Sequence, residues 1–210
     1  MESGPELNPA PDLVEDDATL DELREAAGAC QACELYRAAT QVVFGAGPSA
    51  ARLMLVGEQP GDVEDREGEP FVGPAGTVLD EALAEAGIPG SSVYLTNVVK
   101  HFRWKPQGKR RLHQTPATRH IRACLPWLEA ELATVRPAAI VCLGAVAAKA
   151  LLGDAFRVTK DHGKPLEWRN YQVVATIHPS SALRAREPQE RSRLKAMLVE
   201  DLESAMRLVD

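Results

Sequence analysis

Four continuous apolar runs are spaced along the chain, each with the length of a single β-strand. They are RLMLVG, VYLTN, AAIVCL and YQVVATI, at residues 52–57, 93–97, 138–143 and 171–177. Strands with one face in water alternate between apolar and polar residues, whereas strands covered on both faces do not. The runs therefore predict a central, mainly parallel four-stranded sheet with helices on each side.

Helical patterns fall between and beyond these runs, as such a sheet requires. Thr115 and Pro116 are expected to be the N-cap and first residue of one helix. The alternation predicts a single three-layer α/β/α domain over residues 17–210, whereas the Pro-, Glu- and Asp-rich residues 1–16 predict a disordered lead-in. The predicted helices cover residues 17–29, 74–88, 116–135, 145–152 and the tail from 188.

Ligands of open parallel sheets bind at the carboxyl ends of the strands. Polar segments follow the predicted strands at 52–57, 93–97 and 171–177, and a further polar loop precedes the helix at 116–135. We therefore expect four segments to converge at that edge: residues 58–62, Asn97, the loop 108–113 and residues 178–181.

Composition narrows the class of protein. A hydrophobic content of 45% and a charged content of 26% are ordinary for a globular protein. No run reaches the roughly 20 apolar residues that span a bilayer, and the first residues lack the basic and apolar regions of a secretory signal. We expect a cytoplasmic protein without a membrane partner, and we expect it to be monomeric.

Positive charge is concentrated in one part of an acidic chain, whose formal net charge is −6. Residues 86–128 hold eight of the 24 Lys and Arg and none of the 30 Asp and Glu. Three of these cations are consecutive, in the segment GKRRLHQTP at 108–116. A local basic zone on an acidic body favours a polyanion that docks at one place.

The four cysteines have different surroundings. Cys30 and Cys33 form a C-x-x-C pair, which in a cytoplasmic chain favours metal or redox chemistry over a structural disulfide. Cys142 lies within an apolar run and is expected to be a buried core residue. Cys124 and His101 are candidates to complete the ligand set. Three thiolates and an imidazole suit either a zinc ion or an iron–sulfur cluster.

Several motifs together resemble a known family. GEQPGDVEDREGEPFVGPAG, YLTNVVKH, HPSS and the C-x-x-C pair resemble, in order and spacing, the iron–sulfur uracil-DNA glycosylases of family 4. The resemblance extends from about Cys30 to the C-terminus. Two departures are His101, where family 4 carries cysteine, and the segment KRRLH at 109–113. Both resemble the UdgX branch, whose hallmark loop is K-R-R-I-H, and Gln59 matches that branch as well.

This resemblance implies a cofactor, a partner and a reaction. It implies a [4Fe–4S] cluster held by Cys30, Cys33, His101 and Cys124, and uracil-containing DNA as the partner. It also implies that the enzyme excises uracil and then becomes covalently joined to the sugar left behind.

Roles in base recognition follow from the same resemblance. Uracil in DNA must be flipped out of the stack before its glycosidic bond can be reached. Phe71 would stack on the flipped base, Asn97 would read its edge, and Gln59 would join them in binding substrate. His178 would donate a hydrogen bond to uracil O2 as negative charge grows on the leaving base.

The remaining candidates concern the sugar and the phosphates. Glu58 and Asp62 are the carboxylates that can stabilise an oxocarbenium-like sugar or accept a proton, and Glu58 is preferred because it directly follows a strand. Ser180 and Ser181 are expected to bind phosphate. Lys109, Arg110 and Arg111 are expected to neutralise phosphates beside the lesion. His113, held close to C1′, is the predicted covalent nucleophile.

Two alternatives remain open. In the first, the protein is a multiple-turnover glycosylase in which KRRLH only grips DNA and water attacks the sugar. In the second, it is a non-catalytic uracil-DNA binding or redox-sensing iron–sulfur protein. A generic nucleotide-binding module is disfavoured because neither G-x-G-x-x-G nor G-x-x-x-x-G-K-[ST] occurs in the sequence.

Overall fold

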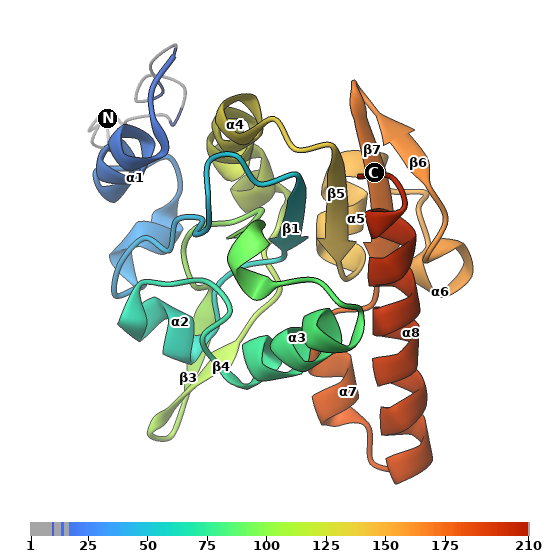
Figure 1. The fold of residues 1–210 in the computed structure, drawn as a ribbon. Coiled ribbons are helices and arrows are strands. Elements are labelled where there is room, and N and C mark those ends of the chain that lie inside the picture. Colours follow the sequence, from blue (N-terminus) through green and yellow to red (C-terminus); the bar gives the residue numbers. More distant parts are fainter. Residues whose placement is uncertain (1–9, 11–13, 15–16, 210) are drawn as a thin grey trace, which may run out of the picture.

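A five-stranded sheet in the order β2–β1–β5–β7–β6 forms the centre of the molecule (Figure 1). Four strands pair in parallel: β1 (Leu53–Gly57), β2 (Val93–Asn97), β5 (Ala139–Leu143) and β7 (Tyr171–Thr176). The mainly parallel sheet is thus confirmed. The fifth strand, β6 (Leu166–Trp168), pairs antiparallel with β7 and has only three residues, too few to give a pattern in the sequence.

This computed structural model describes residue 10, residue 14 and residues 17–209. The predicted disordered lead-in, residues 1–16, therefore lies almost entirely outside the described residues. None of the described helices has the length and apolar character needed to cross a membrane.

Helices cover both faces of the sheet, which gives the expected three layers (Figure 1). On one face lie α3, α7 and α8, and on the other lie α1, α4 and α5. The helices are α1 (Leu20–Gly28), η2 (Glu34–Arg37), α2 (Asp62–Glu67), α3 (Pro74–Glu85), η3 (Gly90–Ser92), α4 (Thr118–Val135), α5 (Ala145–Leu152), α6 (Val158–Asp161), α7 (Ser180–Arg184) and α8 (Pro188–Met206).

The burial of β1 explains why its sequence is apolar at every position. Leu53 and Leu55 pack into the core shared with α3 and α8, whereas Met54 and Val56 pack into the core shared with α1, α4 and α5. All four side chains are buried, and burial of one such side chain contributes about 1.5–3 kcal/mol. The strand is therefore fixed between two layers, and its carboxyl end is a rigid support for the residues that follow.

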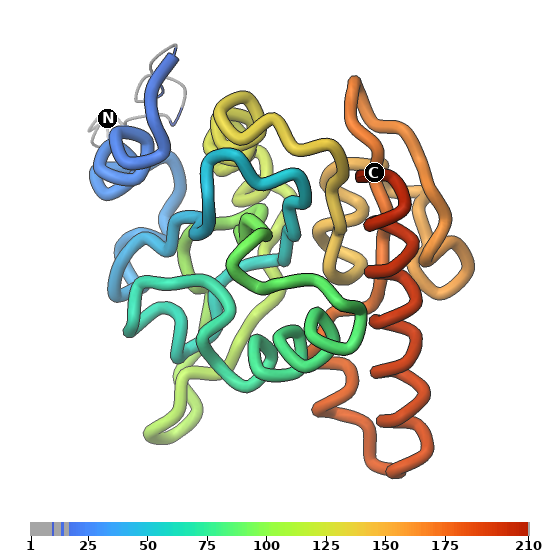
Figure 2. The backbone as a smooth tube through the Cα atoms, viewed as in Figure 1, coloured from blue at the N-terminus to red at the C-terminus, as the bar shows by residue number. Residues whose placement is uncertain are grey.

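The segment that contains GKRRLH is a β-hairpin and not the loop that was expected. It consists of β3 (Trp104–Gln107) and β4 (Arg110–His113), with Gly108 in the turn at φ 58°. The hairpin lies beside α2 and its tip extends away from the body (Figures 1 and 2). Most of its residues are exposed, so no apolar alternation marked these strands in the sequence.

The predicted start of α4 was wrong. The helix begins at Thr118, and the chain remains extended at Ala117, past the expected cap at Thr115. The buried side chain of His120 turns back, and its Nδ1 accepts the N–H of Ala117 at 3.0 Å. This imidazole takes the capping role that was assigned to Thr115.

Candidate active site

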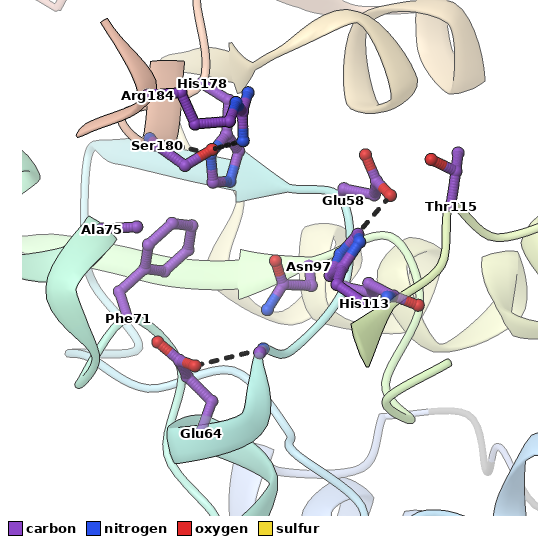
Figure 3. A pocket seen from close by; sticks show the side chains of 12 residues that line it. Glu58, Glu64, Phe71, Ala75, Asn97, His113, Thr115, His178, Ser180 and Arg184 are labelled. Carbon is purple, nitrogen blue, oxygen red and sulfur yellow. Dashed lines mark hydrogen bonds and ion pairs between the residues drawn. The ribbon is translucent and has the colours of Figure 1, made fainter. Parts of the chain in front are cut away.

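The polar segments expected at the carboxyl ends of the strands do converge, around a pocket of about 590 Å³. Figure 3 shows Glu58, which follows β1, and side chains from β2, the hairpin and α7 facing one space. The pocket is lined by Glu58, Gln59, Gly61, Glu64, Phe71, Ala75, Asn97, His113, Thr115, His178, Ser180 and Arg184.

Two glycines allow an aromatic ring and an amide to meet at the end of β1. A Cβ atom on Gly57 would lie 2.4 Å from Asn97 Oδ1 and 2.7 Å from Phe71 Cζ, so only glycine fits. Phe71 itself has φ 59°, and a Cβ on Gly76 would lie 1.6 Å from its carbonyl oxygen. A non-glycine residue held at positive φ is strained, and such strain is often retained at functional sites.

A buried carboxylate fixes the loop that carries Phe71. Glu64 accepts the N–H of Gly61 at 3.1 Å and the N–H of Gly73 at 2.9 Å. These glycines precede α2 and α3, whose first N–H groups have no partner within the helix. Glu64 therefore fixes both ends of residues 61–73, the segment that contains Phe71.

The hydrogen bonds of His178 define its neutral tautomer. Its Nδ1 accepts the backbone N–H of Ser180 at 3.2 Å and lies 2.8 Å from Ser180 Oγ. Arg184 donates to the same Oγ at 2.8 Å, so the hydroxyl hydrogen is free to point at Nδ1. Burial, with Arg184 and His113 nearby, lowers the pKa of His178 to about 4. The ring is therefore neutral at pH 7, with its hydrogen on Nε2.

Glu58 and His113 face each other across the pocket, with Nε2 and Oε1 3.7 Å apart (Figure 3). Burial raises the pKa of Glu58 to about 7, against a smaller lowering by Arg184. Among the described residues, none forms a hydrogen bond with the buried Oε1. Burial and Arg184 lower the pKa of His113, so its imidazole is uncharged at neutral pH. The pair can exchange a proton near physiological pH.

Arg184 lines the pocket and was not among the predicted residues. It contacts Ser180 Oγ and, at 3.4 Å, Ser181 Oγ. It also influences the pKa of three other pocket residues, Glu58, His113 and His178. Its position four residues after Ser180, one helical turn away, is a signal that the sequence did contain.

The side-chain amide of Gln59 makes contacts that were not predicted. Its Nε2 donates to the carbonyls of Arg103 and Gln114 at 3.2 and 3.1 Å, and its Oε1 accepts the N–H of Arg103 at 3.1 Å. Arg103 and Gln114 flank the hairpin, so Gln59 joins its two strands at their base. Gln59 therefore braces the hairpin, and it also lines the pocket, so its role in binding substrate stays a prediction.

Asp62 and Arg111 differ from their predicted roles. The Arg111 guanidinium binds Asp62 through Nε and Asp65 through Nη1, the latter at 2.5 Å, and its side chain is only 15% exposed. Its flat face also lies over the ring of Trp104, 5.5 Å from the centroid. Asp62 additionally pairs with Arg66. Arg111 therefore anchors the hairpin to α2 instead of meeting phosphate, and Asp62 is its partner instead of a catalytic carboxylate.

The other predicted DNA contacts lie at the surface near the pocket. Lys109 and Arg110 are exposed at the hairpin tip. Ser180 lines the pocket, and Ser181 is half-buried beside it on α7. Of these four residues, only Ser180 lines the pocket itself.

Three of the predicted cluster ligands gather where α1, η2 and α4 meet. Cys30 and Cys124 are buried in the same core, and Cys33 packs against that core. Burial raises the pKa of the Cys124 thiol to about 12. The Trp127 indole N–H donates to Cys30 Sγ at 3.3 Å. Crowded, buried thiols become stable anions only beside a strong positive charge, and N–H groups directed at sulfur are typical of iron–sulfur sites.

His101 and Cys142 complete the comparison of the expected ligands. His101 is buried next to Lys100, whose backbone N–H donates to Cys124 Sγ at 3.2 Å. Burial lowers the pKa of His101 to about 4, which leaves it in the neutral form that binds metals. Cys142 is buried within β5, and burial alone raises its pKa.

The four expected ligands do not form a ready-made metal site among the described residues. In the part of the chain that the structure describes, no group of three or more His, Cys, Asp or Glu side chains is close enough to hold one metal ion. A tetrahedral zinc ion needs four ligand atoms within about 2.0–2.3 Å of one point. Neither a zinc ion nor a cluster therefore has a preformed ligand set among these residues.

Comparisons with known proteins agree with the fold. Residues 44–203 match the model of the uracil DNA glycosylase superfamily. A type-4 uracil-DNA glycosylase of Thermotoga maritima is 39% identical over 178 residues, which cover 84% of this chain and 87% of that protein. A type-4 enzyme of Archaeoglobus fulgidus is 35% identical, covering 79% and 85%. A type-5 uracil-DNA glycosylase of Pyrobaculum aerophilum is 31% identical, covering 64% and 63%. The chain belongs to the uracil DNA glycosylase superfamily and is similar over most of its length to the type-4 enzymes.

Proposed function

We propose that this protein excises uracil from DNA and becomes joined through His113 to C1′ of the sugar that remains. The observation that carries the proposal is the hairpin, which brings an uncharged imidazole into the pocket and within 3.7 Å of Glu58. Glycosylase activity is supported by the similarity to type-4 enzymes over 84% of the chain. Covalent capture is supported by the chemistry of the Glu58–His113 pair.

Recognition of the base is assigned to Phe71 and Asn97. A flipped uracil would enter the pocket with one face on the Phe71 ring. The Asn97 side chain offers one acceptor and two donors, which can pair with the N3–H and O4 edge of uracil. Gly57 lets both groups approach the same point, so the pocket has the shape and the polarity that a planar pyrimidine requires.

Departure of the base is assisted by His178. Cleavage of the C1′–N1 bond leaves its electron pair on uracil, and the charge spreads to O2. A neutral imidazole with its hydrogen on Nε2 can donate to that oxygen without giving up a proton. Hydrogen bonds directed at developing charge are worth about 10²–10³ in rate.

Capture of the sugar is assigned to His113. The unprotonated nitrogen of its imidazole supplies the electron pair of a new bond to C1′ as the bond to uracil breaks. The alkylated ring would carry a positive charge, and the ionised Glu58 carboxylate can accept the hydrogen of the other ring nitrogen. The product is a neutral alkylimidazole with no good leaving group, so one protein molecule would act once.

Contacts with the DNA backbone are assigned to the hairpin and to α7. Lys109 and Arg110 at the hairpin tip can neutralise phosphates, since they are exposed cations. Arg184, with Ser180 and Ser181, offers a guanidinium and two hydroxyls on α7. Phosphates on either side of a flipped nucleotide would then be held while the base occupies the pocket.

Cys30, Cys33, His101 and Cys124 would hold a [4Fe–4S] cluster. When bound, the cluster supplies a cross-link between the segments that these residues occupy, namely the end of α1, the turn after β2 and α4. Asn97 is the last residue of β2, so the ligand His101 is close in sequence to the base-recognition residue.

Release of uracil is the test of the proposed activity. The protein should liberate free uracil from a uracil-containing oligonucleotide and none from a matched thymine-containing oligonucleotide, as measured by chromatography of the supernatant. With covalent capture, the amount released should not exceed the amount of protein. Absence of release would refute the activity, and release in large excess over protein would support the multiple-turnover alternative instead.

A further inference from the structure

A buried ion pair lies directly behind the pocket. Lys100 Nζ and Glu131 Oε2 are 2.5 Å apart, and their side chains are 1% and 0% exposed. Glu131 Oε1 also accepts the N–H of Gly45 at 2.9 Å and the hydroxyl of Tyr94 at 3.1 Å. None of these residues lines the pocket, so the pair takes no part in the proposed chemistry directly.

Fold stability does not account for this pair. Removing two charges from water costs free energy that their attraction often fails to recover, and apolar pairs of similar volume are frequently as stable or more stable. A buried charge pair in a core that is otherwise apolar is therefore better explained by the geometry that it imposes. The question becomes which group the ammonium orients.

The ammonium of Lys100 donates to the main chain of Asn97. Nζ lies 2.8 Å from the Asn97 carbonyl oxygen and 2.6 Å from Thr96 Oγ1. The backbone of Lys100 is held separately, because its N–H donates to Cys124 Sγ at 3.2 Å. The hydrogen bond to Cys124 fixes the backbone of Lys100, and its side chain folds back over the turn. The ammonium thereby holds Asn97, the last residue of β2, in place.

Asn97 has little freedom to compensate for a change at this point. Its Oδ1 and the ring of Phe71 crowd the Cα of Gly57, at 2.4 and 2.7 Å from the ideal Cβ position. A rotation of the Asn97 peptide would swing the side-chain amide against Gly57 or away from the base. Errors of about 0.5 Å or 10–20° are enough to weaken a preorganised site.

We propose that Lys100 is a positioning residue for uracil recognition, which holds the Asn97 peptide so that the side-chain amide meets the base. The inference rests on the proposed function and names a residue that acts through Asn97. Glu131 is needed to keep the ammonium in place. Lys100 and Glu131 therefore influence uracil recognition through Asn97, without contacting the base.

The test replaces the ion pair by a neutral pair of similar shape, K100M/E131Q. The glutamine introduced at position 131 can still accept from Gly45 and Tyr94 and can donate to Thr96, whereas the methionine introduced at position 100 has no donor for the Asn97 carbonyl. K100L/E131Q removes the same donor with a branched side chain and serves if the first variant does not fold. Tyr94→Phe is the matched control. It removes the hydrogen bond that the Tyr94 hydroxyl donates to Glu131, and it leaves the hydrogen bond from Lys100 to Asn97 intact.

Single-turnover uracil release, affinity for undamaged DNA and thermal unfolding are measured for each variant. K100M/E131Q should release uracil roughly ten- to a hundredfold more slowly, the usual effect of losing a hydrogen bond to a charged group, with unchanged affinity for undamaged DNA. Tyr94→Phe should unfold at a lower temperature and release uracil at the wild-type rate. If Tyr94→Phe slowed uracil release as much as K100M/E131Q does, Lys100 would contribute only to the stability of the fold.

The decisive measurement repeats the substitution in an Asn97→Ala background. Because Lys100 is proposed to act through the Asn97 side chain, K100M/E131Q should add almost no further loss there. Losses that multiply would overturn the inference. Failure of the wild-type protein to release uracil would refute the proposed function, whereas wild-type release with an unaffected K100M/E131Q variant would refute only the role of Lys100.

Discussion

The imidazole of His113 lies 3.7 Å, Nε2 to Oε1, from the carboxylate of Glu58, and the two side chains come from different parts of the fold. Glu58 directly follows β1, a strand buried on both faces, whereas His113 ends the exposed hairpin. Burial moves their pKa values in opposite directions, up to about 7 for Glu58 and down for His113. A carboxyl group that ionises near neutral pH therefore faces the uncharged imidazole that we propose as the nucleophile.

Covalent capture should accelerate with rising pH through about 7. Glu58 must be ionised to accept the imidazole proton, and burial places its pKa at about 7. His113, whose pKa is lowered, is already neutral in this range. The rate of adduct formation, followed by quenched time points between pH 5.5 and 8.5, should rise and then level off. Glu58→Gln should be slow and independent of pH, and a wild-type rate that falls across this range would exclude the assignment.

Glu58→Gln should stabilise the fold at alkaline pH. The folded pKa of about 7 lies above the ordinary 4.5, so the folded state binds more protons than the unfolded state between these values. Stability of the wild-type protein therefore declines as pH rises from 4.5 to 7, by up to about 3 kcal/mol. Urea unfolding should show the variant to be more stable at pH 8 and equal to the wild type at pH 4. Equal stability at both pH values would mean that Glu58 is not desolvated.

The cations of the hairpin should separate into two classes. Lys109 and Arg110 are exposed, so K109A/R110A should reduce the slope of log K against log salt by up to about two, because each phosphate contact contributes about 0.9. Arg111 is bound to Asp62 and Asp65, so Arg111→Ala should leave the slope unchanged and lower the yield of adduct by loosening β4. Fluorescence anisotropy with undamaged DNA gives the slopes. A reduced slope of log K against log salt in Arg111→Ala would mean that Arg111 does contact a DNA phosphate.

Replacement of Cys124 and of Cys142 should have different effects on bound iron. Cys124→Ser should lose iron and sulfide, since Cys124 is buried in the same core as Cys30, and Cys33 packs against that core. Cys142→Ser should retain both, because Cys142 is buried within β5 and serves as the matched control. Iron and acid-labile sulfide, measured on purified protein, give the result. Stoichiometric zinc without iron in the wild-type protein would refute the cluster.

The parallel sheet could be predicted from the sequence because its strands are buried on both faces. β2 and α5 match their predicted bounds, and β1, β5 and β7 differ by one residue at one end. The hairpin could not be predicted in this way. Its strands have four residues each, carry cations and a proline, and are held by Arg111 and Gln59 through contacts distant in sequence.

Some residues of the candidate site could be predicted from the sequence, and others could not, because their contacts are distant along the chain. Glu58 and His178 follow strands and Asn97 ends one, so their convergence is a consequence of the topology. Asp62 and Gln59 lie in the same motif as Glu58, but their partners are 44 to 55 residues away along the chain. Their role as braces depends on where the hairpin folds back, which no local pattern specifies.

The central claim is that His113 forms the bond to DNA, and one measurement tests it most directly. Wild-type protein and His113→Ala are incubated with a uracil-containing oligonucleotide, separated on a denaturing gel, and the shifted band is digested for mass spectrometry. The wild-type protein should give a shifted band whose sugar adduct lies on the peptide containing Leu112, His113 and Gln114. His113→Ala should give no such band while still releasing uracil, because Glu58, Phe71, Asn97 and His178 remain in place. A full-strength band in His113→Ala, or an adduct on His178 or His120, would contradict the account.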